Sequence, residues 1–413
     1  MYRFTPAAWV SIALTLFAVA LALAFLNHLL VYTAVFFATG NLGLFIWSIL
    51  STRGLTVERE HPSTCLRGYP LTITLRIRNR GRGARFALIG YDCFLPAGHD
   101  KAYREIAVLS LAAGSSAEAS YQATPRRRGI FEIGPFYFYS GDPFGFYRHV
   151  RRVDALTQLA VLPTPLNTRV NYLHSTSQVR KDELATIAMP GYSSEFLGVR
   201  EYADGDPLRK IHWASTARLG KLITKQFERN VASTLCVLLV NDERSGTGKE
   251  EEHTPLEYSI TLISTLAREA SRANYLFSFL EINGKDIRAA SGTGDNFFQT
   301  LALQLAEIGP GHPLDLQEHT QEIFEYLKPG SDLIIFTPHL TGTQAKFLAN
   351  LRLQYRLLSV ITFDLGSFRT SMPARERRSR VSFGKNFIIF ELAYGDDLER
   401  QLQRFVEKVG FVR

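Results

Sequence analysis

The first fifty residues of the chain almost lack charge. Arg3 is the only Lys, Arg, Asp or Glu among them, although the 413-residue chain contains 47 basic and 39 acidic residues. Nearly all ionisable groups therefore lie beyond Ser51. Such an asymmetry is typical of a membrane anchor followed by a soluble body.

Cysteine is scarce, and the histidines lack metal-binding spacing. The three cysteines, Cys65, Cys93 and Cys236, show no CxxC spacing, which agrees with a reducing compartment and with small buried residues. The ten histidines form no HxH or HExxH pattern, and no GxxxxGK[ST] loop occurs. These absences argue against a zinc hydrolase and against ATP chemistry in this chain. We expect no cofactor.

The positive charge points to lipid more than to nucleic acid. The formal net charge is +8, which favours contact with an anionic lipid surface. The arginine and aromatic interleaving of nucleic-acid-binding modules does not occur, so no nucleic acid partner is expected. The basic cluster at residues 369–380 is interpreted as a solvated loop. Its alternative is contact with anionic lipid or an acidic partner.

Two apolar runs, residues 7–26 and 30–50, predict a transmembrane helical hairpin. Each run is long enough to cross a hydrocarbon core of about 30 Å, and Trp47 lies where an interfacial aromatic is expected. A cleaved signal peptide is the alternative, but the first run is too long and continues into a second. Asn41 in the second run is predicted to bond across the helix interface.

The distribution of arginine predicts the orientation of the hairpin. Arg3 precedes the hairpin, and Arg53, Arg59 and Arg67 follow it, whereas the turn contains no basic residue. By the positive-inside rule, both termini lie in the cytoplasm. We therefore expect a multi-pass protein of the bacterial inner (cytoplasmic) membrane, with its soluble domains in the cytoplasm.

Residues 53–162 predict an all-β sandwich of the immunoglobulin or fibronectin kind. In residues 71–78, aliphatic side chains alternate with threonine and arginine, as in a half-buried strand. Short runs of this type recur between turn residues, with no amphipathic helix among them. Asp142–Gly145 is predicted to be a tight turn. The aromatic run at residues 136–139 is interpreted as strand residues, with a carbohydrate or peptide platform as the alternative.

The remainder of the chain predicts an α/β domain. Residues 163–229 are interpreted as a linker arm and a charged segment, and residues 1–52 form the membrane hairpin. From residue 230 to 413, apolar strands alternate with helical patterns, which indicates a mainly parallel sheet. A capping box with proline at the first helical position begins at Thr254.

The segment "GYSSEFLGVREYADGDPLRKIHWASTARLGKLITKQFE" (Gly191–Glu228) resembles the signature of the family called domain of unknown function 58. The stretch Arg127–Tyr147 resembles a region that commonly lies upstream in that family. The resemblance implies a von Willebrand factor A-like fold for the α/β domain. It also implies partnership with a MoxR-type AAA+ ATPase, a group associated with the assembly of other complexes.

The metal loop that the resemblance implies departs from its pattern. Many von Willebrand A-like domains hold a metal ion with an Asp-x-Ser-x-Ser loop, and the matching loop here is residues 242–246. Arg244 stands at a ligand position, and a guanidinium cannot coordinate a divalent cation. We expect no metal, with Asp242 and Ser245 as remnants of the loop.

The signature segment allows three interpretations. Ser215, His212 and Asp206 contain the residue types of a hydrolase triad, but they lie within ten residues and show no nucleophile turn or oxyanion hole. The segment is otherwise a structural clasp or a docking site. In the clasp, Ile211 and Trp213 fill a core, and Arg200, Asp204, Asp206 and Arg209 pair with one another. The residues assigned to partner binding or to structure are Arg200, Glu201, Tyr202, Gly205, Asp206, Arg209, His212, Trp213, Arg218 and Lys225.

The sequence therefore predicts a non-catalytic, membrane-anchored scaffold or adaptor. Its expected partners are a MoxR-type AAA+ ATPase and the lipid bilayer, and its expected work is complex assembly or maintenance of the cell envelope. The alternative is a metal-dependent or hydrolytic enzyme that uses the region of Asp206, His212 and Asp242.

Overall fold

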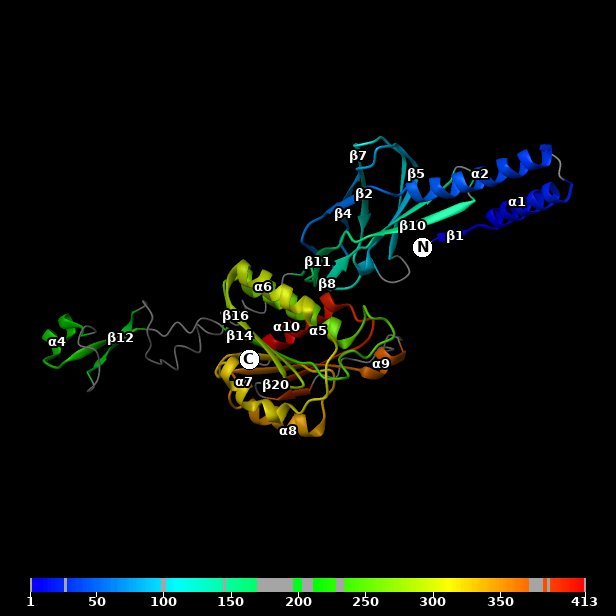
Figure 1. Cartoon of the computed structure of the whole chain (residues 1–413). Helices are drawn as coiled ribbons and strands as arrows, with labels where there is room; N and C mark the ends of the chain where they lie inside the picture. The colour runs from blue at the N-terminus through cyan, green and yellow to red at the C-terminus, as the bar shows by residue number, and fades with distance from the viewer. Residues whose placement is uncertain are drawn as a thin grey trace. The chain divides into compact units, whose positions relative to one another are not determined.

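The computed structural model divides the chain into two compact units (Figure 1). One unit contains residues 1–164 and 306–308, and the other contains residues 165–305 and 309–413. The residues that the structure describes are 2–25, 28–97, 102–142, 144, 146–168, 196–202, 211–227, 234–370, 382–384 and 387–411. Most of the predicted linker arm, residues 169–195, lies outside them.

Two apolar helices begin the first unit. Helix α1 (Pro6–Phe25) and helix α2 (His28–Leu50) are long and apolar enough to cross a membrane. Large apolar side chains point away from both helices; Leu23 and Phe36 are each 72% exposed. Such a surface is unfavourable in water and favourable in lipid. The two helices could therefore span a membrane.

Asn41 joins the two helices, as predicted. The Ser11 hydroxyl donates to Asn41 Oδ1 at 2.8 Å, and Asn41 Nδ2 donates to Thr15 Oγ1 at 2.9 Å. Both partners lie on α1, so the amide is satisfied across the helix interface.

A short strand before α1 was not predicted. Strand β1 (Tyr2–Phe4) pairs antiparallel with β10 (Tyr147–Val153), with Tyr2 opposite His149 and Phe4 opposite Tyr147. Three residues are too few for a periodic pattern, and the partner strand lies far away in the sequence. The pairing joins the start of the chain to the β-rich part of the same unit.

The β-rich part of this unit is a sandwich. Its sheets have the orders β1-β10-β9-β5-β6, β2-β4-β7 and β3-β11-β8. Apolar residues from the first two sheets, such as Leu75 of β4 and Phe138 of β9, share one core. The remaining strands are β2 (Leu55–Glu60), β3 (Thr64–Leu66), β4 (Leu71–Asn79), β5 (Arg85–Cys93), β6 (Tyr103–Leu111), β7 (Ser116–Ala123), β8 (Gly129–Ile133), β9 (Phe136–Gly141) and β11 (Thr157–Leu162), with a 3-10 turn at Leu95–Ala97.

The alternation in β4 is confirmed: Leu71, Ile73, Leu75 and Ile77 are buried, and each is at most 6% exposed. The aromatic run in β9 also alternates. Phe136 and Phe138 are fully buried in the core, whereas Tyr139 is exposed. A platform made of all four aromatic residues is therefore wrong, because a strand places successive side chains on opposite faces.

A buried ion pair lies inside the sandwich. The side chains of Arg59 and Asp92 are both 0% exposed, and Arg59 Nε donates to Asp92 Oδ2 at 3.1 Å. The Tyr121 hydroxyl donates to the same carboxylate oxygen at 2.7 Å. In the sequence, Arg59 indicates only the membrane orientation, and no local pattern predicts its contact with Asp92.

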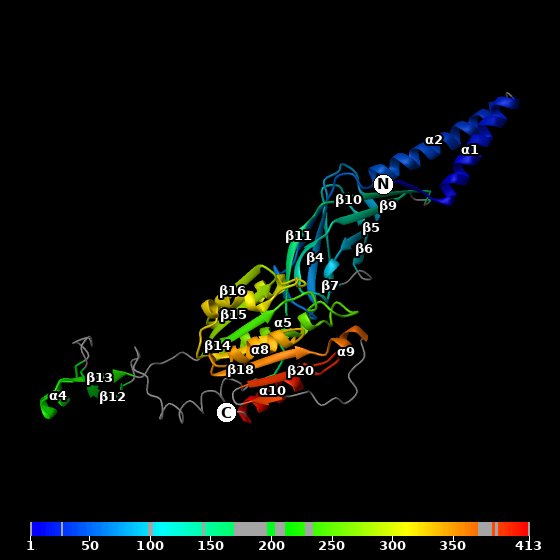
Figure 2. The same ribbon diagram turned by 90° about the horizontal axis from the view of Figure 1, so that it is seen from below.

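The α/β part of the second unit is built on a mixed sheet with the order β16-β15-β14-β17-β18-β20-β19 (Figures 1 and 2). The five central strands are parallel, and only the two edge strands are antiparallel. The strands are β14 (Thr234–Val240), β15 (Leu276–Asn283), β16 (Asp286–Gly292), β17 (Asp332–Phe336), β18 (Leu357–Phe363), β19 (Ser382–Gly384) and β20 (Phe387–Leu392).

Helices cover both faces of this sheet. Ile323 of α7 and Leu348 of α8 share a core with Leu238 and Leu333 of the strands, and α5 and α10 contact the other face. Thr254 caps α5, as predicted, by accepting the N–H of Glu257 at 3.2 Å. The helices are α5 (Pro255–Arg272), α6 (Gly294–Glu307), α7 (Thr320–Tyr326), α8 (Gly342–Leu351), α9 (Leu365–Thr370) and α10 (Leu398–Phe411), with a 3-10 turn at Leu316–His319.

Cysteine has no cross-linking role in this fold. Cys93 and Cys236 are buried, Cys65 is half-buried, and all three are free thiols. Burial raises the pKa of the Cys65 thiol to about 11, so the group is protonated at neutral pH and is a poor nucleophile.

Candidate functional site

The signature segment folds as a β-hairpin that carries a short helix. Strands β12 (Phe196–Glu201) and β13 (Ile223–Phe227) pair antiparallel, and α4 (Trp213–Leu219) lies between them in the sequence (Figure 1). The backbone N–H of His212 donates to the carbonyl of Ile223 at 2.7 Å, and that of Tyr202 donates to the carbonyl of Leu222 at 2.9 Å. Tyr202, just after β12, and His212, just before α4, are therefore both hydrogen-bonded to the backbone at the start of β13.

The structure brings some signature residues together. Arg200 lies opposite Thr224 in the ladder, and Lys225 lies opposite Val199. Glu201 forms an ion pair with Lys221 at 3.2 Å, with both side chains about 70% exposed; exposed pairs of this kind contribute little stability. Gly205, Asp206 and Arg209 lie outside the described residues, as does Asp204, so the predicted clasp of Arg200, Asp204, Asp206 and Arg209 stays a prediction.

His212 acts as the N-cap of α4. Its Nδ1 accepts the backbone N–H of Ser215 at 3.2 Å and lies 2.7 Å from the Ser215 hydroxyl. Both contacts use Nδ1, the atom that an orienting acid normally engages in a hydrolase triad, where Nε2 contacts the nucleophile. A side chain that accepts the third N–H of a helix satisfies an otherwise unpaired donor. The geometry of His212 and Ser215 is therefore that of a cap.

The prediction that Ile211 and Trp213 both fill a core is wrong for Trp213. Ile211 is 4% exposed, but the Trp213 side chain is 68% exposed in this segment. Ile211 forms a bridge to Thr224 and so faces β13, whereas Trp213 begins α4. A short helix on a two-stranded hairpin has only one covered face, so the remaining apolar side chains stay exposed.

Trp213 lies close in sequence to four other exposed residues with large apolar or basic side chains. Leu219 is 59% exposed and Leu222 is 45% exposed, and the basic residues Arg218 and Lys221 are also exposed. We call these five residues the α4 patch. Tryptophan and arginine are the residue types enriched at the hot spots of protein interfaces, and the α4 patch exposes one of each.

Residues 242–246, the loop that the resemblance matches to a metal loop, follow β14. Asp242 and Ser245 are buried, and Asp242 Oδ1 accepts the backbone N–H of Arg244 at 2.8 Å. In the loop after the neighbouring strand β17, the Thr337 hydroxyl donates to the carbonyl of His339 at 3.0 Å. In the described part of the chain, no group of three or more His, Cys, Asp or Glu is arranged to hold a metal ion. This donor set does not fit a divalent cation, because one oxygen of the Asp242 carboxylate already closes the turn and a guanidinium stands where a hydroxyl would ligate.

Asp242→Asn is expected to raise the free energy of unfolding at neutral pH. Burial raises the pKa of the Asp242 carboxyl, so the folded state binds its proton more tightly than the unfolded state does. Ionisation therefore opposes folding as the pH rises above the unfolded pKa of about 3.9, and the asparagine removes this effect. Its side-chain oxygen still accepts the Arg244 N–H. The unfolding temperatures of the wild-type and Asp242→Asn full chains, compared from below this pKa to neutral pH, measure the difference in stability.

The same variant checks the metal assignment. We expect Mg²⁺, Mn²⁺ and Ca²⁺ to leave the unfolding temperature of the wild type and of Asp242→Asn unchanged. If one of these ions stabilises the wild type and the variant loses that effect, a metal site at Asp242 would be established and our assignment would be wrong.

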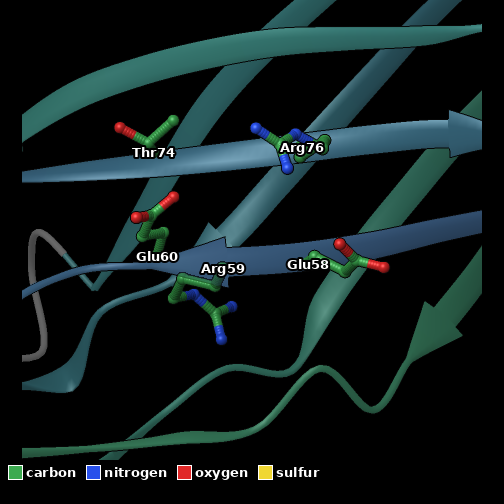
Figure 3. A pocket seen from close by; sticks show the side chains of 5 residues that line it. All are labelled: Glu58, Arg59, Glu60, Thr74 and Arg76. Carbon is green, nitrogen blue, oxygen red and sulfur yellow. The ribbon is translucent and has the colours of Figure 1, made fainter.

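A small pocket lies on the outer surface of β2 and β4 (Figure 3). It has a volume of about 160 Å³ and is lined by Glu58, Arg59, Glu60, Thr74 and Arg76. Arg59 points to the opposite side of β2 from Glu60, into the sandwich. Arg76 is paired with Glu118 at 2.6 Å. The pocket is smaller than the roughly 300 Å³ of small-molecule sites, so it carries no catalytic assignment.

Most of the basic cluster at residues 369–380 lies outside the described residues. Arg369 lies in the last turn of α9, and residues 371–381 are outside the described part of the chain. The interpretation of this cluster as a solvated loop, and its alternative of lipid or partner contact, both stay predictions.

Several solved structures match about a quarter of this chain at low sequence identity. The solution NMR structure of a CARDB domain from Pyrococcus furiosus is 14% identical and covers 26% of this chain and 94% of its own, with a TM-score of 0.20. A crystal structure of that domain in complex with di-metal ions is 17% identical and covers 26% and 87%, also with a TM-score of 0.20. The PKD domain of an M14-like peptidase from a Thermoplasmatales archaeon is 12% identical and covers 26% and 93%, with a TM-score of 0.17.

Sequence comparison reaches further into the signature region. No curated protein matches the chain. Residues 198–365, which contain most of the described part of the signature hairpin and most of the α/β sheet, match the model of a family described as "Protein of unknown function DUF58". This match supports the family that the signature residues predict.

Proposed function

We propose that this chain is a non-catalytic, membrane-anchored scaffold that binds a partner protein through the signature hairpin. The observation that carries the proposal is the α4 patch, in which Trp213, Leu219 and Leu222 are exposed beside Arg218 and Lys221. Desolvation of an exposed tryptophan supplies binding free energy, and the cations select an acidic surface.

The partner that we propose is a MoxR-type AAA+ ATPase, working with this chain in complex assembly or envelope maintenance. The family resemblance supports this choice, and the lack of a phosphate-binding loop in the sequence means that ATP chemistry has to come from a second protein. A basic patch also fits an acidic surface on that ATPase.

We further propose that the α/β unit is von Willebrand factor A-like. The sheet places β14 between β15 and β17, with one antiparallel strand, β16, at the edge beyond β15. The chain therefore adds β15 on one side of β14 and the later parallel strands on the other side. The loop after β14 lies at this switch point, where such sheets bind ligands. With Arg244 in that loop, a protein contact replaces a metal-mediated one.

The proposed location is the bacterial inner membrane, with the two helices spanning it and the rest of the chain in the cytoplasm. The length and exposed apolar surface of α1 and α2 support the anchor. The arginines that flank the helices support the orientation.

Crosslinking of the membrane-embedded full chain, with and without ATP, tests the partner. We expect an AAA+ ATPase to be recovered from wild-type membranes and its yield to change with ATP. Recovery of no AAA+ ATPase in either state would overturn the proposed partnership.

The enzyme alternative has a separate check. The contact between His212 and Ser215 joins two residue types that hydrolases use. We expect the purified chain to show no ester or peptide hydrolysis. Hydrolysis that disappears in His212→Ala but persists in Asp242→Asn would replace the scaffold with a hydrolase.

A further inference from the structure

The loop between β9 and β10 lies beside the membrane-crossing helices of its own unit. The hydroxyl of Tyr147, the first residue of β10, donates to Asn41 Oδ1 at 3.0 Å. The Tyr147 ring also meets Phe45 edge-on, with the ring centroids 5.5 Å apart. These two contacts place Tyr147 against α2 itself rather than beyond its end.

The position of Asn41 gives the depth of this contact. Asn41 lies nine residues before Leu50, the last residue of α2, which corresponds to about 14 Å along a helix. It also precedes Trp47, the aromatic residue predicted at the membrane interface. If α2 crosses the bilayer, Tyr147 therefore lies on the hydrocarbon side of that interface.

The loop is also joined to α1. Thr5, which directly precedes α1, donates from its backbone N–H and its hydroxyl to the carbonyl of Phe146, at 3.2 and 2.9 Å. Together with the ladder between β1 and β10, these bonds give the loop a fixed height relative to both helices.

Several backbone groups of the described loop residues form hydrogen bonds within the protein. The carboxylate of Asp142 accepts the N–H of Phe144 at 2.9 Å and that of Tyr147 at 2.6 Å, and Asp142 is itself only 6% exposed. Hydrocarbon supplies no hydrogen bonds, so a loop that enters it has to pair its own polar groups. The Asp142 carboxylate accepts from Phe144 and Tyr147, and Thr5, which precedes α1, donates to the carbonyl of Phe146.

The remaining surface of the loop is aromatic. Phe144 is 71% exposed and stacks on Phe146, with the ring centroids 6.1 Å apart. Both rings line a groove of about 650 Å³ whose other walls are side chains of α1 and α2, including Val10 and Phe37. The polar side chains in the groove, Ser11 and Asn41, bond to each other.

We propose that Phe144 and Phe146 enter the hydrocarbon of the bilayer beside α1 and α2, and that an acyl chain of a membrane phospholipid lies in the groove between them. The inference rests on the proposed membrane anchor. An acyl chain fits because the groove is apolar and is walled by the helices that face lipid. Arg148, the next exposed residue, then lies where anionic headgroups are found.

Tryptophan quenching by brominated lipid tests the inference. In a full-length chain with Trp9, Trp47 and Trp213 replaced by Phe, a single tryptophan is introduced by Phe144→Trp. The chain is reconstituted into phosphatidylcholine vesicles brominated in the middle of the acyl chains, which quench only on contact. We expect the Phe144→Trp emission to lose most of its intensity, and Tyr147→Phe, which removes the bond to Asn41, to lessen that loss.

Two control variants separate the possible outcomes. The first control is Tyr69→Trp in the same background. Tyr69 is exposed and precedes β4, whose opposite end pairs with Leu55 after α2. The emission of this variant should not change. A chain with Trp213→Phe alone keeps Trp9 and Trp47 and reports on the helices. If Trp9 and Trp47 are quenched and the tryptophan of Phe144→Trp is not, the inference about the loop is wrong although the membrane anchor stands. If none is quenched, the membrane anchor fails as well.

Discussion

Arg59→Ala is expected to destabilise the sandwich by about 3–5 kcal/mol, because it leaves the Asp92 carboxylate buried without its cation. Both side chains are 0% exposed. A loss of this size is a large part of the roughly 5–15 kcal/mol that stabilises a typical domain. We expect Arg59→Ala to unfold at a markedly lower urea concentration than the wild type.

Several bonds would be lost together. Arg59 donates to Asp92 at 3.1 Å, to the carbonyl of Ile133 at 3.1 Å and to the hydroxyl of Thr157 at 3.3 Å. These partners lie on different strands, so one guanidinium satisfies groups from several parts of the sandwich. The Tyr121 hydroxyl would remain as a donor to Asp92, but a neutral donor cannot replace the positive charge.

Arg76→Ala is the matched control. Arg76 pairs with Glu118 at 2.6 Å, but the two side chains are 54% and 57% exposed. Exposed pairs contribute about 0–1 kcal/mol, so this variant should unfold close to the wild type. Equal effects of the two substitutions, in urea unfolding of the full chain followed by circular dichroism, would contradict the assigned role of the buried pair.

Trp213→Ala is expected to weaken binding of the proposed ATPase by at least about thirtyfold, which corresponds to a hot-spot loss of about 2 kcal/mol. Trp213 is the largest exposed side chain of the α4 patch and is 68% exposed. Its removal takes away contact area in the complex without taking a side chain from the core of the hairpin. The affinity of purified partner for the reconstituted chain measures the effect.

Tyr69→Ala provides the comparison, since this aromatic residue is 57% exposed but lies in the sandwich. We expect it to leave the affinity unchanged. Arg218→Ala should weaken binding mainly at low salt, because screening reduces interactions between exposed charges. Unchanged affinity in Trp213→Ala, with α4 still folded, would remove the α4 patch from the proposed interface.

Local patterns in the sequence were sufficient for much of the fold. The two long apolar runs predicted α1 and α2, the alternation at residues 71–78 predicted the buried face of β4, and Thr254 with Glu257 predicted the start of α5. Each of these signals depends on residues within one element. Asn41 was also interpreted correctly, since an amide in an apolar helix requires a partner on its neighbour.

Elements without a strong pattern of their own were missed. Strand β1 has three residues and exists through its pairing with β10, and the edge strands β16 and β19 likewise depend on their neighbours in the sheet. A strand that is stabilised by its partner contains little information about that partner in its own residues.

The sequence by itself determined that the chain has two apolar helices, a β-rich region, an α/β region and a family signature. Only the tertiary structure decided where individual polar and aromatic side chains point. It placed Arg59 inside the sandwich, Tyr147 against Asn41 and Trp213 on the surface of the hairpin. The physical reason is that burial depends on which distant segments cover a side chain, and periodicity along the chain describes only the element to which that side chain belongs.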